Sequence, residues 1–393
     1  MKIQFHKTSI VYTIWIMLFV ICSGSCIGLI YAKYFDISYV VFGIFVGIFG
    51  KHSLRKRDLY TLLIFCLFYL LNFLVNISGA PNYNAYISYV IRMVGTLFLI
   101  NTIDSGLFER KYTRIIIIIA ALSLMVFVAY NFWGYAPIKS INGFNLIGPF
   151  NIQVYYRRDS GIFWEPGAYQ FFLNLALFYL LKEADWNLFK NKSHFVGGII
   201  LIISILTSQS TTGYFILLLI ALVYFYKNWK KMSKISKIAM TIPIFVMIVL
   251  IIANVLASNT VAGKFNSENA SYNIRMIDLK GTFELLMEEF PVLGYGFQTT
   301  TLERIYATKG IVRNSVGILS CMMSMGILYT AVYLKLIIKQ IRARNNYWID
   351  KQLEVMIILL VCFSEAFFQY PILFAFLFSF NRNSDSVSLN NSI

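Results

Sequence analysis

The chain is organised around the segment RRDSGIFWEP at residues 157–166, which holds two arginines, two carboxylates, a glycine and a proline. An apolar run, Ala168–Leu181, follows it and is long enough to enter a membrane. A dense charged cluster therefore stands at the mouth of a predicted membrane helix. Ionisable groups at that depth are costly unless they are paired or used. The segment is consequently the first candidate for a functional site.

The composition indicates an integral membrane protein. Hydrophobic residues make up 58% of the 393, aromatic residues 17% and charged residues only 13%, whereas soluble domains carry about a quarter charged residues. The apolar residues recur in long blocks rather than in the alternating pattern of a membrane barrel. We expect an all-α polytopic protein with about twelve transmembrane helices, forming one domain over 1–380 with a disordered tail at 381–393.

The predicted spans follow the apolar blocks. The last block, Leu353–Phe380, exceeds one crossing of about 20 residues and is divided in two because Glu365 and Pro371 interrupt it. A turn is expected at Lys33–Asp36. The other ten predicted spans are Ser9–Tyr31, Ile37–Gly50, Leu59–Val75, Ala85–Ile103, Ile115–Trp133, Ala168–Leu181, Phe195–Thr207, Gly213–Tyr226, Ile238–Ala257 and Asn314–Leu334.

The distribution of basic residues predicts the orientation. The net charge of +16 would suit a nucleic-acid partner, but the Lys and Arg residues cluster in short loops between apolar blocks. With the N-terminus inside, cytoplasmic segments hold 23 of the 34 Lys and Arg residues, the opposite side holds 10, and Arg92 lies mid-span. The positive-inside rule then places both termini in the cytoplasm and the two long loops, 134–167 and 258–313, outside.

The outer loops carry arginines that suit phosphate recognition. A guanidinium is planar, permanently charged and able to bind phosphate oxygens in a bidentate fork. A lipid pyrophosphate at the membrane surface would need such groups, while the alternative is that the arginines only snorkel to lipid headgroups. The residues are Arg157, Arg158, Arg275, Arg304 and Arg313.

An amphipathic helix is predicted at Asn273–Phe290. Apolar residues recur there at helical spacing, at 276, 279, 283, 286 and 290, opposite acidic residues at 278, 284 and 288. The helix would hold Arg275 near its positive N-terminus. A packing helix that closes the bundle is a compatible alternative. Pro291 follows, and Gly294 and Gly296 then supply a flexible turn.

Glu165 has two possible roles. It precedes Pro166, which can open the next helix. As a general base it would accept a proton from a substrate hydroxyl; as a brace it would hold Arg158 in place. Glu365, in the break between the last two spans, is a weaker candidate of the same kind.

Histidine and cysteine usage excludes several chemistries. All three histidines lie on or beside predicted cytoplasmic loops, so histidine-dependent serine triads and zinc sites are excluded from the outer face. All five cysteines fall within apolar blocks, with no spacing suited to a metal or a disulfide framework.

Several of these motifs resemble the Wzy-type polysaccharide polymerases and O-antigen ligases. The resemblance covers roughly 155–330, with the motifs in the family's order. The first motif is Arg158-x-x-Gly161-x-Phe163-x-Glu165-Pro166, and the second is the serine-rich break at 208–213, where Thr211 replaces the usual arginine. The others are Arg275 with Pro291-x-x-Gly294-x-Gly296, and Arg313-Asn314-Ser315, with arginine where ligases commonly carry histidine.

This resemblance implies a membrane glycosyltransferase of the GT-C type. Such enzymes transfer an undecaprenyl-pyrophosphate-linked glycan onto an acceptor sugar at the outer face of the bacterial cytoplasmic membrane, with no nucleotide sugar, metal or other cofactor. By the resemblance, Arg158 and Arg275 hold the donor pyrophosphate and Glu165 orients or deprotonates the acceptor hydroxyl. Substrate binding would involve Arg157, Gly161, Arg304, Arg313, Asn314, Gly294 and Gly296.

The resemblance also implies partners and leaves alternatives. The expected partners are the lipid-linked oligosaccharide, the bilayer, and a chain-length regulator and flippase of the same pathway, with no nucleic acid. The missing histidine favours a repeat-unit polymerase over an O-antigen ligase. A flippase for the same lipid-linked glycan is a third possibility, although transporters usually show internal repeats and this chain shows none.

The predicted topology can be checked by cysteine accessibility. Cysteines introduced at Lys139 and Ser267 should react with an impermeant thiol reagent in intact spheroplasts, because both loops are expected outside. A cysteine at Lys230 should stay unlabelled. Labelling at position 230, with no labelling at positions 139 and 267, would show that the protein has the opposite orientation in the membrane.

Overall fold

The computed structural model describes residues 2–49, 54–134, 138–147, 152–155, 158–229, 270–311 and 316–381. The chain is mostly helical, with 77% helix in 15 helices among these residues. The expectation of a helical protein is confirmed. A small antiparallel sheet lies in the first long loop and departs from the expected all-α architecture.

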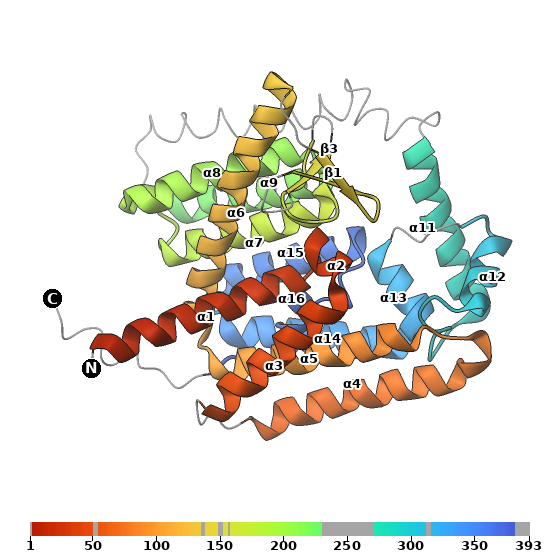
Figure 1. Cartoon of the computed structure of the whole chain (residues 1–393). Helices are drawn as coiled ribbons and strands as arrows, with labels where there is room; N and C mark the ends of the chain where they lie inside the picture. Colours follow the sequence, from red (N-terminus) through yellow and green to blue (C-terminus); the bar gives the residue numbers. More distant parts are fainter. Residues whose placement is uncertain are drawn as a thin grey trace.

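The helices pack side by side, with α7 in the middle and α4 along one edge (Figure 1). Their bounds are α1 Lys2–Cys22, α2 Cys26–Ile30, α3 Ala32–Phe49, α4 Lys56–Val75, α5 Tyr83–Thr102, α6 Ser105–Trp133, α7 Pro166–Glu183, α8 Lys192–Ser208, α9 Thr211–Asn228, α11 Ala270–Glu289, α12 Thr300–Thr308, α13 Gly317–Met325, α14 Ile327–Arg344, α15 Trp348–Ser364 and α16 Pro371–Phe374.

Helix α7 is the buried axis of the bundle. Pro166 opens it at the first helical position, where a missing N–H costs nothing and the ring fixes a helical φ. Every residue from Ala168 to Leu181 is buried. A helix that is apolar all round has to be enclosed by others, and α6, α8, α9 and α15 all contact it.

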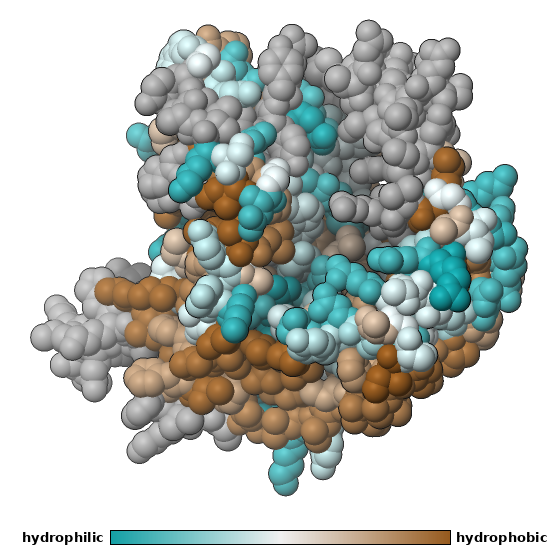
Figure 2. All heavy atoms as spheres, turned by 45° about the vertical axis from the view of Figure 1, so that its right-hand side comes forward, coloured by the Kyte–Doolittle hydropathy of each residue, from teal (hydrophilic) through white to brown (hydrophobic). Residues whose placement is uncertain are grey.

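Among the described residues, four helices are long and apolar enough to cross a membrane: α4, α5, α6 and α9. Helix α4 presents a stripe of exposed leucines at helical spacing, at positions 63, 67, 70 and 74. Figure 2 shows hydrophobic surface gathered over the lower part of the molecule and hydrophilic surface above it. Exposed apolar areas of this kind mark contact with lipid or another protein. The count of about twelve spans stays a prediction, and the expected span Ile238–Ala257 lies outside the described residues.

Two predicted span boundaries are wrong. The turn expected at Lys33–Asp36 is helical, inside α3. The chain turns instead at residues 23–25, just after α1. Gly24 lies there at φ +105°, a conformation that favours glycine.

The expected span Asn314–Leu334 is broken, and from Gly317 onward it forms two helices, α13 and α14. Gly326 separates them at φ +98°, and a Cβ there would overlap the backbone at Val292. The N–H of Ile327 donates to the carbonyl of Pro291 at 3.0 Å. Residues after α11 therefore supply the partners for this break.

The small sheet follows α6. Its strands are β1 Ile138–Ile141, β2 Phe144–Ile147, β3 Ile152–Tyr155 and β4 Arg158–Asp159, in the order β1-β2-β3-β4 and all antiparallel. Asn142 and Gly143 join β1 to β2 with φ of +49° and +82°. Two positive φ values suit the tight hairpin turn for which Asn-Gly is the strongest short-range signal. The all-α prediction overlooked this hairpin signal, although it is present in the sequence.

The end of the bundle is not a regular span. Helix α15 stops at Ser364 and α16 is a single short turn that begins at Pro371. The interruption predicted at Glu365 and Pro371 is therefore confirmed. Residues 371–378 are buried all the same, and irregular backbone at that depth requires enclosure by protein.

Candidate functional site

The segment 158–165 is held by the break between α1 and α2. The N–H of Cys26 donates to the carbonyl of Ile162 at 2.7 Å, and Ser25 forms a β-bridge with Phe163. The indole of Trp164 occupies the space where a Cβ on Gly24 would lie. This corner is consequently fixed by residues from the start of the chain.

Arg158 lies at the end of α8. It is half-buried, and its Nε and Nη2 donate to the carbonyls of Ser208 and Gln209, each at 3.4 Å. The last carbonyls of a helix carry partial negative charge and lack helical partners. Arg158 therefore joins the first motif to the serine-rich break at 208–213.

The serine-rich break at 208–213 also packs against α7. Ser210 caps α9, and its hydroxyl accepts from the N–H of Gly213 at 3.4 Å. A Cβ on Gly213 would lie 2.9 Å from the Cβ of Gln170, and Asn174 Nδ2 donates to the carbonyl of Gly213 at 3.3 Å. The glycine is therefore needed for close approach of α9 to α7.

Glu165 is the residue that precedes α7, and its side chain is half-buried. Its Oε1 accepts a hydrogen bond from the indole N–H of Trp164 at 2.8 Å. No ion pair joins Glu165 to Arg158 in the part of the chain that the structure describes. The hypothesis that Glu165 holds Arg158 in place therefore has no ion pair to support it among the described residues.

Glu365 lies at the same end of α7 as Glu165. A Cβ on Gly167, in the first turn of α7, would overlap Oε1 of Glu365. The carbonyl of Glu365 fills the corresponding space beside Gly317, where α13 begins. The positive end of a helix favours a carboxylate. Two glutamates far apart in the sequence therefore approach one helix end, and Glu365 is a stronger candidate than its sequence context indicated.

An aromatic stack connects this end of α7 to a buried ion pair. The ring of Trp164 stacks on Tyr370, with centroids 5.2 Å apart and planes at 25°. The guanidinium of Arg92 lies 5.4 Å from the ring centroid of Tyr370. Arg92 Nε donates to Asp36 Oδ1 at 2.8 Å, and both side chains are buried. The sequence-based prediction left Arg92 without a role. A buried cation within a long apolar helix was the available signal.

Backbone conformation and close packing explain the glycines at the predicted positions 161, 294 and 296. Gly161 has φ +56°, and a Cβ on it would lie 2.8 Å from the ring of Tyr169. Gly294 and Gly296 have φ of +72° and +81°. The N–H of Gly296 donates to the carbonyl of Ser324 at 2.8 Å. These positions require glycine for backbone conformation and close packing, and the turn expected at Gly294 and Gly296 is present.

The remaining predicted site residues are either distant from the start of α7 in the sequence and exposed, or outside the described residues. Arg304 is exposed on α12, whose buried side packs with α11 in a separate hydrophobic cluster. The predicted helix is confirmed as α11, which contains Arg275, but the side chain of Arg275 is outside the described part. Arg157, Arg313 and Asn314 also lie outside the described residues.

The inner face of α11 differs from the predicted one. Asp278, expected on the polar side, is buried at 1% exposure, whereas Phe283 and Phe290 are 58% and 63% exposed. Leu285 and Leu286 supply the packing contacts. Helix α11 therefore turns a partly apolar face outward.

Asp159 is a buried carboxyl beside the site. Ser123 Oγ donates to its Oδ1 at 2.5 Å, and the N–H of Gly161 donates to the same oxygen at 3.1 Å. Burial raises the pKa of Asp159 to about 6, and these hydrogen bonds act in the opposite direction. Asp159 therefore fixes the turn at Gly161 with a carboxyl that titrates near neutrality.

No family model matches this chain, and no curated protein matches it closely enough to count as a relative. The fold defines a helical protein with apolar helices of membrane length. Among the described residues, no group of three His, Cys, Asp or Glu residues is placed to hold a metal ion. Function is therefore inferred from the residues of this site and their geometry.

Replacing Asp159 with asparagine should stabilise the protein at neutral pH. A carboxyl whose pKa is raised on folding favours the fold at low pH and loses that contribution as pH rises through about 6. The cost at pH 7 is on the order of 3 kcal/mol. Asparagine does not ionise and keeps an acceptor oxygen for Ser123 and Gly161.

The check is the melting temperature of the purified protein across this pH range. Asp159→Asn should raise the melting temperature relative to the wild type, and this difference should grow as pH rises from acid to neutral. Parallel pH profiles for the two proteins would contradict a buried, titrating Asp159.

Proposed function

We propose that this protein is an oligosaccharide repeat-unit polymerase of the Wzy type. It would transfer an undecaprenyl-pyrophosphate-linked glycan onto the acceptor sugar of another lipid-linked repeat unit at the outer face of the bacterial cytoplasmic membrane. The proposal rests on the motifs that resemble this family, together with the positions of the residues that carry them.

The contact between the first two motifs is the observation that supports the proposal best. Arg158 hydrogen-bonds to Ser208 and Gln209 of the serine-rich break. Glu365 lies against Gly167, directly after the first motif, and against Gly317, shortly after the last motif. Segments from three parts of the sequence therefore gather around the first turn of α7.

The reaction needs a base and a means to stabilise the leaving group. The acceptor hydroxyl would attack the anomeric carbon of the donor glycan, forming a glycosidic C–O bond. The C–O bond to the pyrophosphate would break, and undecaprenyl pyrophosphate would leave with the bonding electron pair. A glutamate at the start of α7 would take the hydroxyl proton, and Arg158 and Arg275 would stabilise the charge that develops on the pyrophosphate.

Glu165 is our first choice for the base, with Glu365 as its neighbour. The hydrogen bond from Trp164 holds Glu165 through one oxygen, Oε1. The indole in turn stacks on Tyr370 and is fixed over Gly24. A carboxylate held by a rigid aromatic support is oriented as an acid–base group requires.

A gel of glycans from cells lacking the protein tests the proposed activity. Loss of a polymerase should leave glycan of a single repeat unit on the acceptor, because transfer to the acceptor is intact while chain growth is not. Restoration of long chains by the wild-type gene is the control. Complete absence of glycan from the acceptor would indicate a ligase instead, and unchanged chain lengths would refute both.

Glu165→Gln should lower the rate of polymerisation by about two to four orders of magnitude, the range expected for a general base. Glutamine keeps an acceptor for the Trp164 N–H but cannot take a proton at neutral pH. Glu365→Gln is the informative comparison, and Glu303→Gln is the matched control because Glu303 is exposed on α12.

Chain lengths should be measured in the deletion strain at equal expression of each variant. Short chains in Glu165→Gln with normal chains in Glu303→Gln are expected. If Glu365→Gln fails while Glu165→Gln retains normal chains, Glu365 is the base. Normal chains in both would remove the carboxylates from the mechanism.

A further inference from the structure

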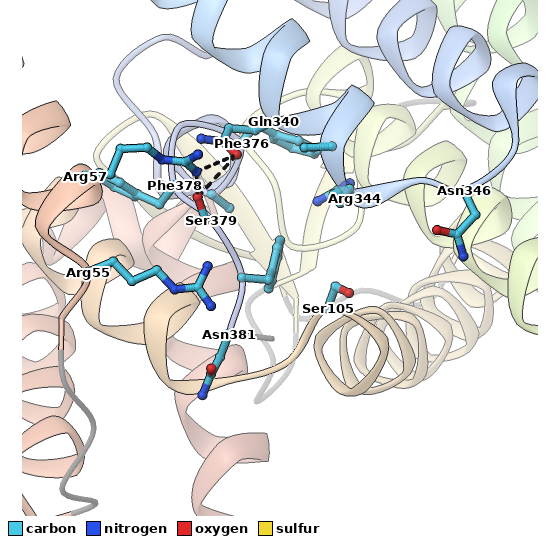
Figure 3. Close-up of a pocket in the computed structure, with 13 residues that line it drawn as sticks. Arg55, Arg57, Ser105, Gln340, Arg344, Asn346, Phe376, Phe378, Ser379 and Asn381 are labelled. Atoms are coloured by element: carbon cyan, nitrogen blue, oxygen red, sulfur yellow. Dashed lines mark hydrogen bonds between the residues drawn. The ribbon is translucent and has the colours of Figure 1, made fainter. Parts of the chain in front are cut away.

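A second candidate site lies at the other end of the helix bundle. A cavity of about 670 Å³ is bordered by the start of α4, the start of α6, the end of α14 and residues 375–381 (Figure 3). Helix α4 begins here and ends beside residues 293–294, to which Asn72 and Asn76 donate hydrogen bonds. Its 20 residues separate the two ends by about 30 Å. Arg344, which lines the cavity, donates a hydrogen bond to the hydroxyl of Tyr179 near the C-terminal end of α7, so the cavity lies at the opposite end of α7 from Glu165.

Three arginines line this cavity, and no aspartate or glutamate is among the described residues that line it. Arg55 and Arg57 come from the start of α4, and Arg344 comes from the end of α14. Arg57 lies 3.8 Å from Asp58 and Arg344 pairs with Glu354, and both of these carboxylates are fully buried. Two of the three arginines are therefore balanced by carboxylates, and Arg55 carries the remaining positive charge of the described lining.

Two of the arginines are held in position. Arg344 forms an ion pair with Glu354, and its guanidinium lies 4.6 Å from the ring centroid of Phe376. Arg57 Nη2 donates to Gln340 Oε1 at 3.3 Å and to the hydroxyl of Ser379. These contacts leave little freedom in the walls, and a pre-organised site loses little entropy on binding.

Arg55 is differently placed. Its backbone N–H donates to Asn101 Oδ1 at 3.2 Å, which fixes the main chain. The guanidinium extends from α4 toward the middle of the cavity, and no hydrogen bond from it is found within the described part of the chain (Figure 3). Its half-buried position lowers competition from water. Arg55 is therefore the donor available to a ligand.

The rest of the lining is partly polar and partly aromatic. Asn346, Ser379 and Asn381 supply neutral hydrogen-bonding groups, whereas Phe376, Phe378 and Phe380 supply apolar walls. Guanidinium groups recognise phosphate through paired N–H donors. Aromatic walls beside them suit a ligand whose phosphate carries an apolar or ring-containing part.

We propose that this cavity binds a phosphate-bearing anion. The shared chemistry is a phosphate held by the guanidinium of Arg55, beside the N–H groups of the paired Arg57 and Arg344, and its source is either a phospholipid headgroup or a soluble phosphate compound. The site does not depend on the proposed polymerase activity, because it lies at the opposite helix ends and uses none of the same residues.

Binding can be measured as stabilisation of the full-length protein. In the soluble arm, protein in micelles of the phosphate-free detergent dodecyl maltoside is titrated with inorganic phosphate, with chloride at matched ionic strength as the blank. In the lipid arm, the same micelles without added lipid are compared with micelles that also contain phosphatidylglycerol. A saturable rise in melting temperature is expected in one or both arms, and the responding arm identifies the source.

Arg55→Gln should weaken the apparent affinity about tenfold or more, since a hydrogen bond to a charged group is lost. Ala343→Phe, which fills the cavity without a change of charge, should have a similar effect. The matched control is Arg342→Gln, an exposed arginine on the same helix end that does not line the cavity. No stabilisation in either arm, or equal loss in Arg342→Gln, would overturn the proposal.

Discussion

Backbone groups at helix interruptions need partners inside the protein, and this requirement shapes the whole bundle. An unpaired N–H or C=O in an apolar interior costs several kcal/mol. The break after α1 is satisfied by Ile162, the break after α8 by Arg158, and the break at Gly326 by Pro291. The polar segments that resemble catalytic motifs are therefore the same segments that complete the helices.

This arrangement links site geometry to stability. Trp164 fills the space above Gly24 and stacks on Tyr370, and Tyr370 lies over the Arg92 guanidinium. Removing one partner of the buried pair between Arg92 and Asp36 would leave an uncompensated charge at a cost of about 3–5 kcal/mol. The support under Glu165 is thus over-determined, which suits a residue that has to be oriented for chemistry.

Local signals in the sequence predicted the local features well. Pro166 begins α7, the periodic apolar residues at 273–290 form α11, and the last apolar block breaks at Glu365 and Pro371. Asn142-Gly143 was an unused hairpin signal. The broken span at Gly326 escaped prediction because its partner, Pro291, lies in another segment and a lone glycine within an apolar run is ambiguous.

The candidate site was predicted only in part, because most of it depends on contacts between distant segments. No local pattern reveals that Glu365 reaches Gly167, that Arg158 bonds to the end of α8, or that Trp164 meets Tyr370. The bracing of Arg158 by Glu165 was inferred from their closeness in sequence. In the structure, the strand and turn between them direct the two side chains to different partners.

We propose that the corner at the start of α7 transfers glycan from a lipid pyrophosphate. The most direct measurement uses purified protein in vesicles supplied with lipid-linked repeat units extracted from cells that lack it. Wild-type protein should lengthen the glycan and release one undecaprenyl pyrophosphate for each linkage formed, and Arg158→Ala should do neither. Chain growth without release of pyrophosphate lipid, or undiminished growth with Arg158→Ala, would contradict it.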